Sequence, residues 1–179
     1  GPAVLRQYLR GGQAARVSRD RYLFQGFDRS RPLREFNVTA ELHNRKLPVP
    51  RPLAACCQRY GPWYSGALIT ARINRAVPLA DFLGVVSADD ELWSQVGATI
   101  RKFHEHGVVH ADLNARNILM AANQPHLIDF DRARIRKASM VNATGNLRRL
   151  KRSFVKLWPE GAAHDLDSCW LALSKGYQQ

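Results

Sequence analysis

Three oxygen-bearing side chains beside two strand-like apolar segments constrain this chain more than any other feature. Asp112 and Asn117 fall within one loop, and Asp129 follows the apolar segments 118–120 and 127–128. The interval between Asn117 and Asp129 fits a β-hairpin that returns the second side chain beside the first. Phosphoryl transfer needs such a set: one carboxylate accepts the proton of a hydroxyl, and an oxygen pair holds Mg²⁺ against phosphates. The pattern therefore predicts phosphoryl transfer to a hydroxyl.

Strands are predicted early in the chain and helices later, which is the order of an α+β fold. Strands are expected at residues 4–8, 53–59 and 64–73. Ser30 is expected to cap the first helix, which ends near Arg45 because the prolines that follow forbid its continuation. Further helices are expected at 78–83, from Asp89 to Gly107, and in two segments after residue 138.

The charge of the chain indicates an anionic partner. Lys and Arg number 27 against 15 Asp and Glu, which gives a net charge of +12. Such a surplus attracts nucleic acid, phosphorylated small molecules or an acidic membrane face. A basic nucleic-acid-binding domain is the alternative from another functional class. No zinc finger, RNA-recognition signature or G-x-x-G loop supports it, so no nucleic-acid partner is expected.

The three cysteines support neither a disulfide framework nor a zinc ribbon. Cys56 and Cys57 are adjacent, Cys169 is distant, and no C-x-x-C is present. An odd count with this spacing is typical of reduced thiols, and we expect the adjacent pair to be small buried hydrophobic residues. No apolar run is long enough to span a membrane, so a soluble cytosolic chain is expected.

The residues around the predicted loop carry a family resemblance. His-x-Asp-x-x-x-x-Asn, followed by a short hairpin and Asp-Phe, resembles the catalytic loop and metal-binding motif of the protein-kinase-like fold. More narrowly, the chain resembles the lipopolysaccharide core kinases, above all those that act on 3-deoxy-D-manno-octulosonic acid (Kdo). The segments that carry this resemblance are residues 5–12, 34–36, 47–52 and 110–114.

The resemblance implies ATP and Mg²⁺ as cofactors and gives the loop residues roles. Asp112 would be the general base, and Asn117 and Asp129 would be Mg²⁺ ligands. His110 is expected to brace the loop by hydrogen bonds rather than bind zinc. Asn114 belongs to the catalytic loop, where it stands at the position of a lysine in protein kinases, so help with the γ-phosphate charge must come from elsewhere.

The resemblance also implies a nucleotide pocket. Glu35 matches the helix residue that pairs with a strand lysine to hold the α- and β-phosphates, and Arg6 stands at the lysine position. A guanidinium can clamp phosphate and carboxylate, although its geometry differs from that of lysine. Backbone near Ala71 and Ile73 is expected to contact adenine. Asp131 replaces the glycine of Asp-Phe-Gly and is expected to adopt its left-handed φ.

Two lobes are expected: a partial N-lobe at residues 1–73 and a small, mainly helical C-lobe at 74–179. The chain opens with Gly1 and Pro2 rather than Met. The glycine-rich loop that covers ATP in the resembled fold would lie upstream of Val4, so a truncated N-lobe is expected. An inactive kinase fragment is therefore one alternative.

The substrate implied by the resemblance is an acidic glycolipid. Arg132 and Arg134 leave the metal-binding turn and are expected to contact the acceptor. The implied activity is ATP-dependent phosphorylation of a Kdo hydroxyl on a lipid A precursor. We expect a monomer bound peripherally to the anionic cytoplasmic side of the bacterial inner membrane. The alternatives are a kinase of heptose, of an aminoglycoside, of choline or of another small molecule, and a RIO-like protein kinase.

Overall fold

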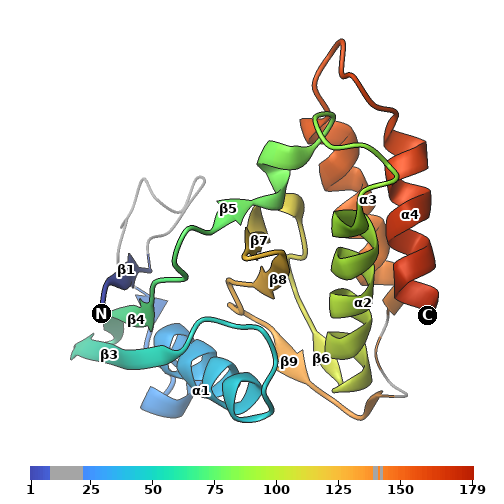
Figure 1. Ribbon diagram of the computed structural model, residues 1–179. Helices are drawn as coiled ribbons and strands as arrows, with labels where there is room; N and C mark the ends of the chain where they lie inside the picture. The colour runs from blue at the N-terminus through green and yellow to red at the C-terminus, as the bar shows by residue number, and fades with distance from the viewer. Residues whose placement is uncertain (9–21, 139–140, 142) are drawn as a thin grey trace.

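The computed structural model describes residues 1–8, 22–138, 141 and 143–179. Figure 1 shows a sheet with one helix, α1 (Arg31–Asn44), on one side of the molecule and a mainly helical part on the other. The chain passes from the sheet to the helical part after residue 71. Residues 9–12, which belong to one segment that carries the family resemblance, lie outside the described residues.

The sheet is antiparallel and is built around β4 (Trp63–Ala71). β3 (Pro52–Tyr60) pairs along β4, while β1 (Ala3–Gln7) and β2 (Tyr22–Leu23) pair with its two ends. The three longer strands lie close to their predicted positions. The expectation of a buried cysteine pair is wrong: Cys56 is exposed and Cys57 half-buried. β3 pairs with a single strand, β4, and most of its side chains are exposed.

Helix α1 positions one side of the candidate site and begins where the sequence predicts. Pro32 occupies its first turn, where a missing N–H costs nothing. Ser30 stands at the N-cap, but its hydroxyl donates to the carbonyl oxygen of Phe27 at 2.6 Å. The predicted side-chain cap is therefore wrong, because the preceding 3-10 turn (Phe27–Arg29) offers a nearer acceptor. The helix ends before Lys46, which has a φ of 60°.

The helical part is built on α2 (Glu91–Glu105), α3 (Ala143–Leu157) and α4 (Leu166–Gln178). Asp90 caps α2 by accepting a hydrogen bond from the backbone N–H of Leu92 at 2.8 Å. Three short antiparallel strands, β5 (Val77–Pro78), β7 (Ile118–Ala121) and β8 (Gln124–Leu127), lie between these helices and the sheet (Figure 1). The segment predicted as a helix at 78–83 is a 3-10 turn over Leu79–Phe82.

The core of the helical part buries large apolar side chains from α2, α3, α4 and the β7–β8 hairpin. Fully buried members include Trp93, Ile100, Phe103, Ile118, Leu127 and Phe154. Burying one such side chain contributes about 1.5–3 kcal/mol. A further strand pair, β6 (Val108–Val109) and β9 (Arg134–Ile135), lies at the start of the loop that carries the candidate catalytic residues. This core fixes the frame from which that loop projects.

Within the described part of the chain, no helix combines the length and the apolar character that crossing a membrane requires.

Helices α2 and α4 cross at two glycines, and adding a methyl group there should destabilise the fold. A Cβ on Gly97 would lie within 3.0 Å of the carbonyl oxygen of Leu173, and one on Gly176 within 3.0 Å of that of Ser94. We expect Gly176→Ala to lower the free energy of unfolding by about 1–3 kcal/mol, because backbone atoms must move apart. Chemical denaturation measures this. Ala98→Ser, on the exposed face of α2, should change it by less than about 0.5 kcal/mol; equal effects would contradict the close crossing.

Candidate active site

Hydrogen bonds of the His110 side chain hold the loop that follows β6. Its Nε2–H donates to the carbonyl oxygen of Ile128 at 3.0 Å, and its Nδ1 accepts from the backbone N–H of Asp112 at 3.2 Å. This pair of bonds requires a neutral ring with the proton on Nε2. Burial lowers the pKa of His110, which favours that neutral form. His110 thus ties the Asp112 loop to the strand that leads into Asp129.

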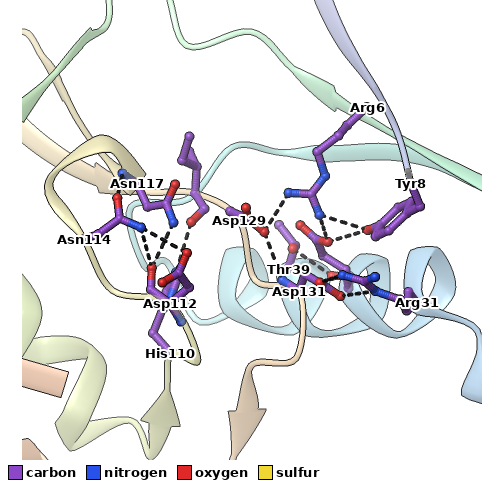
Figure 2. Close-up of polar contacts among 12 residues, drawn as sticks. Arg6, Tyr8, Arg31, Thr39, His110, Asp112, Asn114, Asn117, Asp129 and Asp131 are labelled. Atoms are coloured by element: carbon purple, nitrogen blue, oxygen red, sulfur yellow. Dashed lines mark hydrogen bonds and ion pairs between the residues drawn. The ribbon is translucent and has the colours of Figure 1, made fainter. Parts of the chain in front are cut away.

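Asp112 is exposed, and two asparagine side chains hold its loop in shape (Figure 2). The side-chain amide of Asn114 donates to the Asp112 carboxylate and to its backbone carbonyl, each at 3.1 Å. The amide of Asn117 donates to the same carbonyl at 2.9 Å. The Oδ1 of Asn114 accepts from the backbone N–H groups of Arg116 and Asn117, which caps the 3-10 turn Ala115–Asn117. The amide of Asn114 therefore orients the candidate base.

The β7–β8 hairpin brings Asn117 and Asp129 together. Ile118 pairs with Leu127, and the backbone N–H of Ile128 donates to the carbonyl oxygen of Asn117 at 3.0 Å. Asn117 and Asp129 then line one cavity. The structure thus has the hairpin geometry that the spacing predicts.

The turn after β8 differs from the prediction in one respect. The left-handed residues are Asp129, with a φ of 64°, and Arg132, with a φ of 63°. The expectation of a left-handed Asp131 is therefore wrong. The carboxylate of Asp131 forms an ion pair with Arg31 at the start of α1.

Arg6 joins the sheet, helix α1 and the hairpin. Its Nη1 lies 2.7 Å from Oδ1 of Asp129, and its Nη2 forms an ion pair with Oε2 of Glu35 (Figure 2). The hydroxyl of Tyr8 donates to the same Glu35 oxygen. Glu35 is only 4% exposed; its burial raises its pKa, and Arg6 opposes that shift. The pKa of Arg6 rises despite its burial, because both carboxylates favour its charged form.

These residues surround a cavity of about 320 Å³ between the sheet and the hairpin. Its lining includes the charged and polar groups of Arg6, Glu35, Asn117 and Asp129. Most of the other lining residues are apolar, and Ala71 and Ile73, the predicted adenine contacts, are among them. An apolar cavity with a few polar groups is the usual form of a small-ligand site.

The donor set in this cavity fits a hard cation. Mg²⁺ takes oxygen ligands and is usually held by one or two carboxylates together with phosphates and water. Asp129 offers a carboxylate and Asn117 an amide oxygen. Among the described residues, no group of three or more His, Cys, Asp or Glu could hold a metal ion.

The predicted acceptor residues, Arg132 and Arg134, follow the turn that carries Asp129. Arg132 is exposed at the edge of a smaller cavity of about 130 Å³ that also contains Arg31, Arg34 and Asp131. Arg134 is exposed on β9, where it pairs with Val109, the residue before His110. Arg134 therefore lies beside the start of the loop that carries Asp112, and neither arginine forms a hydrogen bond to Asp112 within the described part of the chain.

The residues of α3 that hold the catalytic loop in place were not identified from the sequence. Asn146 on α3 is buried; its amide donates to the carbonyl oxygen of His110 at 3.1 Å, and its Oδ1 accepts from the backbone N–H of His110 at 3.3 Å. Ser153 on the same helix accepts from the N–H of Ala115 at 3.0 Å. The available signal was a polar Asn146 in helical register with the apolar Leu150 and Phe154.

The second missed element is the Arg31–Asp131 pair. Arg31 Nε lies 2.9 Å from Asp131 Oδ1, and its Nη2 contacts the other carboxylate oxygen. The guanidinium carbon also lies 5.6 Å from the ring centroid of Tyr8 and 5.0 Å from that of Tyr22. This bidentate, partly buried pair ties the first turn of α1, and hence Glu35, to the turn that carries Asp129.

Breaking the Arg31–Asp131 pair should destabilise the protein cooperatively. We expect Arg31→Gln and Asp131→Asn each to lower the free energy of unfolding by about 1–2 kcal/mol, because each leaves a half-buried partner unsatisfied. The double variant should cost less than the sum, with a coupling of about 1 kcal/mol in a double-mutant cycle. Glu41→Gln, which breaks the exposed pair with Arg45, should cost less than about 0.5 kcal/mol. If the effects of the two substitutions on the free energy of unfolding simply added, the Arg31–Asp131 pair would not couple α1 to the turn.

Comparisons with known proteins match this chain to one family over nearly its whole length. The family model described as Lipopolysaccharide kinase (Kdo/WaaP) family matches residues 1–177. A curated relative from Xanthomonas euvesicatoria pv. vesicatoria (strain 85-10), named 3-deoxy-D-manno-octulosonic acid kinase, is 47% identical over 179 residues, which cover 99% of this chain and 72% of the relative. One of the same name from Stenotrophomonas maltophilia (strain R551-3) is 44% identical over 178 residues, covering 99% and 71%.

A solved structure shows the fold independently of close sequence similarity. Amicoumacin kinase hAmiN, in complex with AMP-PNP, Ca²⁺ and Ami, aligns with a TM-score of 0.65 at 13% identity. The alignment covers 98% of this chain and 69% of that chain. This likeness shows the protein-kinase-like fold, which confirms the predicted α+β, protein-kinase-like class.

Proposed function

Since the chain belongs to the lipopolysaccharide kinase (Kdo/WaaP) family, we propose that it is an ATP-dependent carbohydrate kinase acting on a hydroxyl of Kdo in a lipid A precursor. The observation that carries the proposal is the convergence of Asp112, Asn117 and Asp129. Asn117 and Asp129 line one cavity with Arg6 and Glu35, and an amide hydrogen bond links Asn117 to Asp112. The curated relatives of this family that match here carry the Kdo kinase name.

Asp112 is the general base of the proposed reaction. The acceptor hydroxyl oxygen forms a bond to the γ-phosphorus, the bond from that phosphorus to the β–γ bridging oxygen breaks, and ADP leaves. The hydroxyl proton passes to the carboxylate of Asp112, which is exposed and is held by Asn114. His110 and Asn146 keep the loop rigid, so the base is presented in one orientation.

The remaining site residues bind the nucleotide. Asn117 and Asp129 would hold Mg²⁺, which would supply positive charge against the phosphates of the nucleotide. Arg6, paired with Glu35, binds the α- and β-phosphates, and the backbone near Ala71 and Ile73 binds adenine. Arg6 also pairs with Asp129, so nucleotide binding exchanges one of its carboxylate partners for phosphate.

We propose two lobes, an N-lobe at residues 1–73 and a C-lobe at 74–179. Both contribute to the cavity, which supports action as a monomer. The net charge of +12 supports peripheral attachment to the anionic cytoplasmic side of the inner membrane, where each basic residue adds about 1 kcal/mol. Arg132, on the turn after Asp129, and Arg134, whose strand pairs with the start of the catalytic loop, are suited to the carboxylate of the acceptor sugar.

A transfer assay with labelled ATP tests this function. The chain is incubated with γ-labelled ATP and Mg²⁺ and with one of three acceptors: a Kdo-bearing lipid A precursor, a heptose-bearing glycolipid or an aminoglycoside. We expect label in the Kdo acceptor alone, and about 10²–10⁴-fold slower labelling with the Asp112→Asn variant. Label in the heptose acceptor but not in the Kdo acceptor would overturn the substrate assignment. Self-phosphorylation without glycolipid would favour a protein kinase.

A further inference from the structure

A basic groove between α3 and α4 lies outside the site described above. It has a volume of about 900 Å³, against about 320 Å³ for the nucleotide cavity. Four cations line it, together with the half-buried ring of Trp170. These cations are Arg148, Arg149, Lys151 and Arg152. We call this surface the α3–α4 groove.

One of the four groove cations has an acidic partner, and the three arginines have none among the described residues. Lys151 pairs with Asp167 at 3.1 Å and lies 5.7 Å from the ring centroid of Trp170. The three arginines are exposed and form no ion pair with another described residue, and no carboxylate lines the groove. Arg148 and Arg152 are four residues apart on one helix, and such like-charged neighbours repel each other. A bound anion would remove that repulsion.

The helix that lines the groove also contacts the catalytic loop. Helix α3, which carries all four cations, is fastened to His110 by Asn146 and to Ala115 by Ser153. Arg149 lies close enough to His110 for its charge to help lower the pKa of that imidazole. A ligand in the groove would therefore be held on the same rigid helix that supports the Asp112 loop.

The lining of the groove combines the chemistry that recognises a phosphorylated sugar on a lipid. Arginine binds phosphate with two parallel hydrogen bonds, and the face of a tryptophan ring packs against the apolar face of a sugar. Val155, which lines the groove, is 62% exposed. This apolar side chain is suited to contact the start of an acyl chain.

We propose that the α3–α4 groove binds the phosphate-bearing sugar portion of the glycolipid acceptor, and so positions the sugar that receives the new phosphate. This inference rests on the proposed function and deepens it by naming a second contact region for the same substrate. It assigns the groove to the phosphates of the acceptor itself rather than to the headgroups of bulk lipid. Arg148, Arg149 and Arg152 are its positioning residues.

Binding without nucleotide tests the groove separately from catalysis. The probe is a bisphosphorylated, Kdo-bearing lipid A precursor in neutral detergent, titrated into the wild type and into Arg148→Gln/Arg152→Gln. We expect the Kd to rise about tenfold or more in the variant, since charge-assisted hydrogen bonds to phosphate are lost. The matched control Lys156→Gln/Lys175→Gln removes two exposed cations outside the groove and should change the Kd by less than about twofold.

Two further arms identify the phosphate source. The wild type and the groove variant should bind a dephosphorylated precursor equally, and they should bind phosphatidylglycerol vesicles without glycolipid equally. The proposal would be overturned if the control variant lost as much affinity for the precursor as the groove variant. It would also be overturned if the groove variant lost affinity for the dephosphorylated precursor, or lost affinity only for the vesicles. Groove-dependent binding without transfer to Kdo would instead count against the proposed function and leave the groove assignment standing.

The same variant has a kinetic signature. In the transfer assay, Arg148→Gln/Arg152→Gln should raise the KM for the phosphorylated acceptor about tenfold and leave the KM for ATP unchanged, because the groove lies apart from the nucleotide cavity. A purely structural defect would alter both constants or lower the melting temperature. An unchanged acceptor KM would contradict the proposal.

Discussion

Replacing Asp112 by Asn is expected to lower kcat by about 10²–10⁴-fold, which is the range that a general base contributes. The two side chains have nearly the same shape, and the remaining Oδ can still accept from Asn114, so the loop should keep its structure. What the variant loses is the carboxylate that takes the hydroxyl proton. The affinity for ATP should stay within a few-fold of the wild type, because Asp112 does not line the nucleotide cavity.

Steady-state kinetics and ATP titration together check this expectation. Asp89→Asn, which makes the same change on an exposed loop remote from the site, is the matched control and should leave both constants unchanged. A kcat for Asp112→Asn within tenfold of the wild type would show that another group accepts the proton. A large loss of ATP affinity would show that Asp112 belongs to the nucleotide site.

Replacing Asp129 by Asn is expected to remove the Mg²⁺-dependent part of ATP binding. The wild type should bind ATP more tightly with Mg²⁺ than with a chelator, and the variant should bind equally under both conditions, losing about tenfold or more in affinity with Mg²⁺. Asn is the better substitution than Ala at this position, because Asn tolerates the φ of 64° found there. Calorimetric titration with ATP in Mg²⁺ and in EDTA measures the difference.

ATP binding without Mg²⁺ distinguishes the loss of a metal ligand from a general loss of structure in the nucleotide site. Arg6 bridges Glu35 and Asp129, so loss of the Asp129 charge leaves Arg6 with Glu35 and free for phosphate. The binding of ATP in EDTA should therefore be retained or strengthened. Loss of binding in EDTA as well would contradict the assignment of Asp129 to the metal.

Local sequence patterns correctly predicted the features that depend on residues close together in the chain: one helix, one hairpin and one helix end. The spacing of Leu92, Val96, Ile100 and Phe103 indicates a helix, and α2 contains all four. The apolar segments after Asn117 and before Asp129 are too short for anything but a hairpin, and the hairpin places both residues at one cavity. Prolines after residue 47 predicted the end of α1.

Contacts between distant residues could not be predicted in this way. Arg31 and Asp131 are separated by 100 positions, and nothing near either residue indicates the other. The left-handed φ was predicted for Asp131 because glycine stands there in related motifs, whereas the structure places it at Asp129 and Arg132. The Ser30 cap failed because the Phe27 carbonyl competes for the hydroxyl. In each case tertiary context or a neighbouring turn decides the outcome.

The most direct test of the account is a crystal structure of the chain with a non-hydrolysable ATP analogue and Mg²⁺. The account predicts adenine beside Ala71 and Ile73, a metal ion bound by Asn117 and Asp129, and a γ-phosphate facing Asp112. Arg6 should contact phosphate in place of Asp129. A triphosphate bound outside this cavity, or a metal ion that touches neither Asn117 nor Asp129, would contradict it.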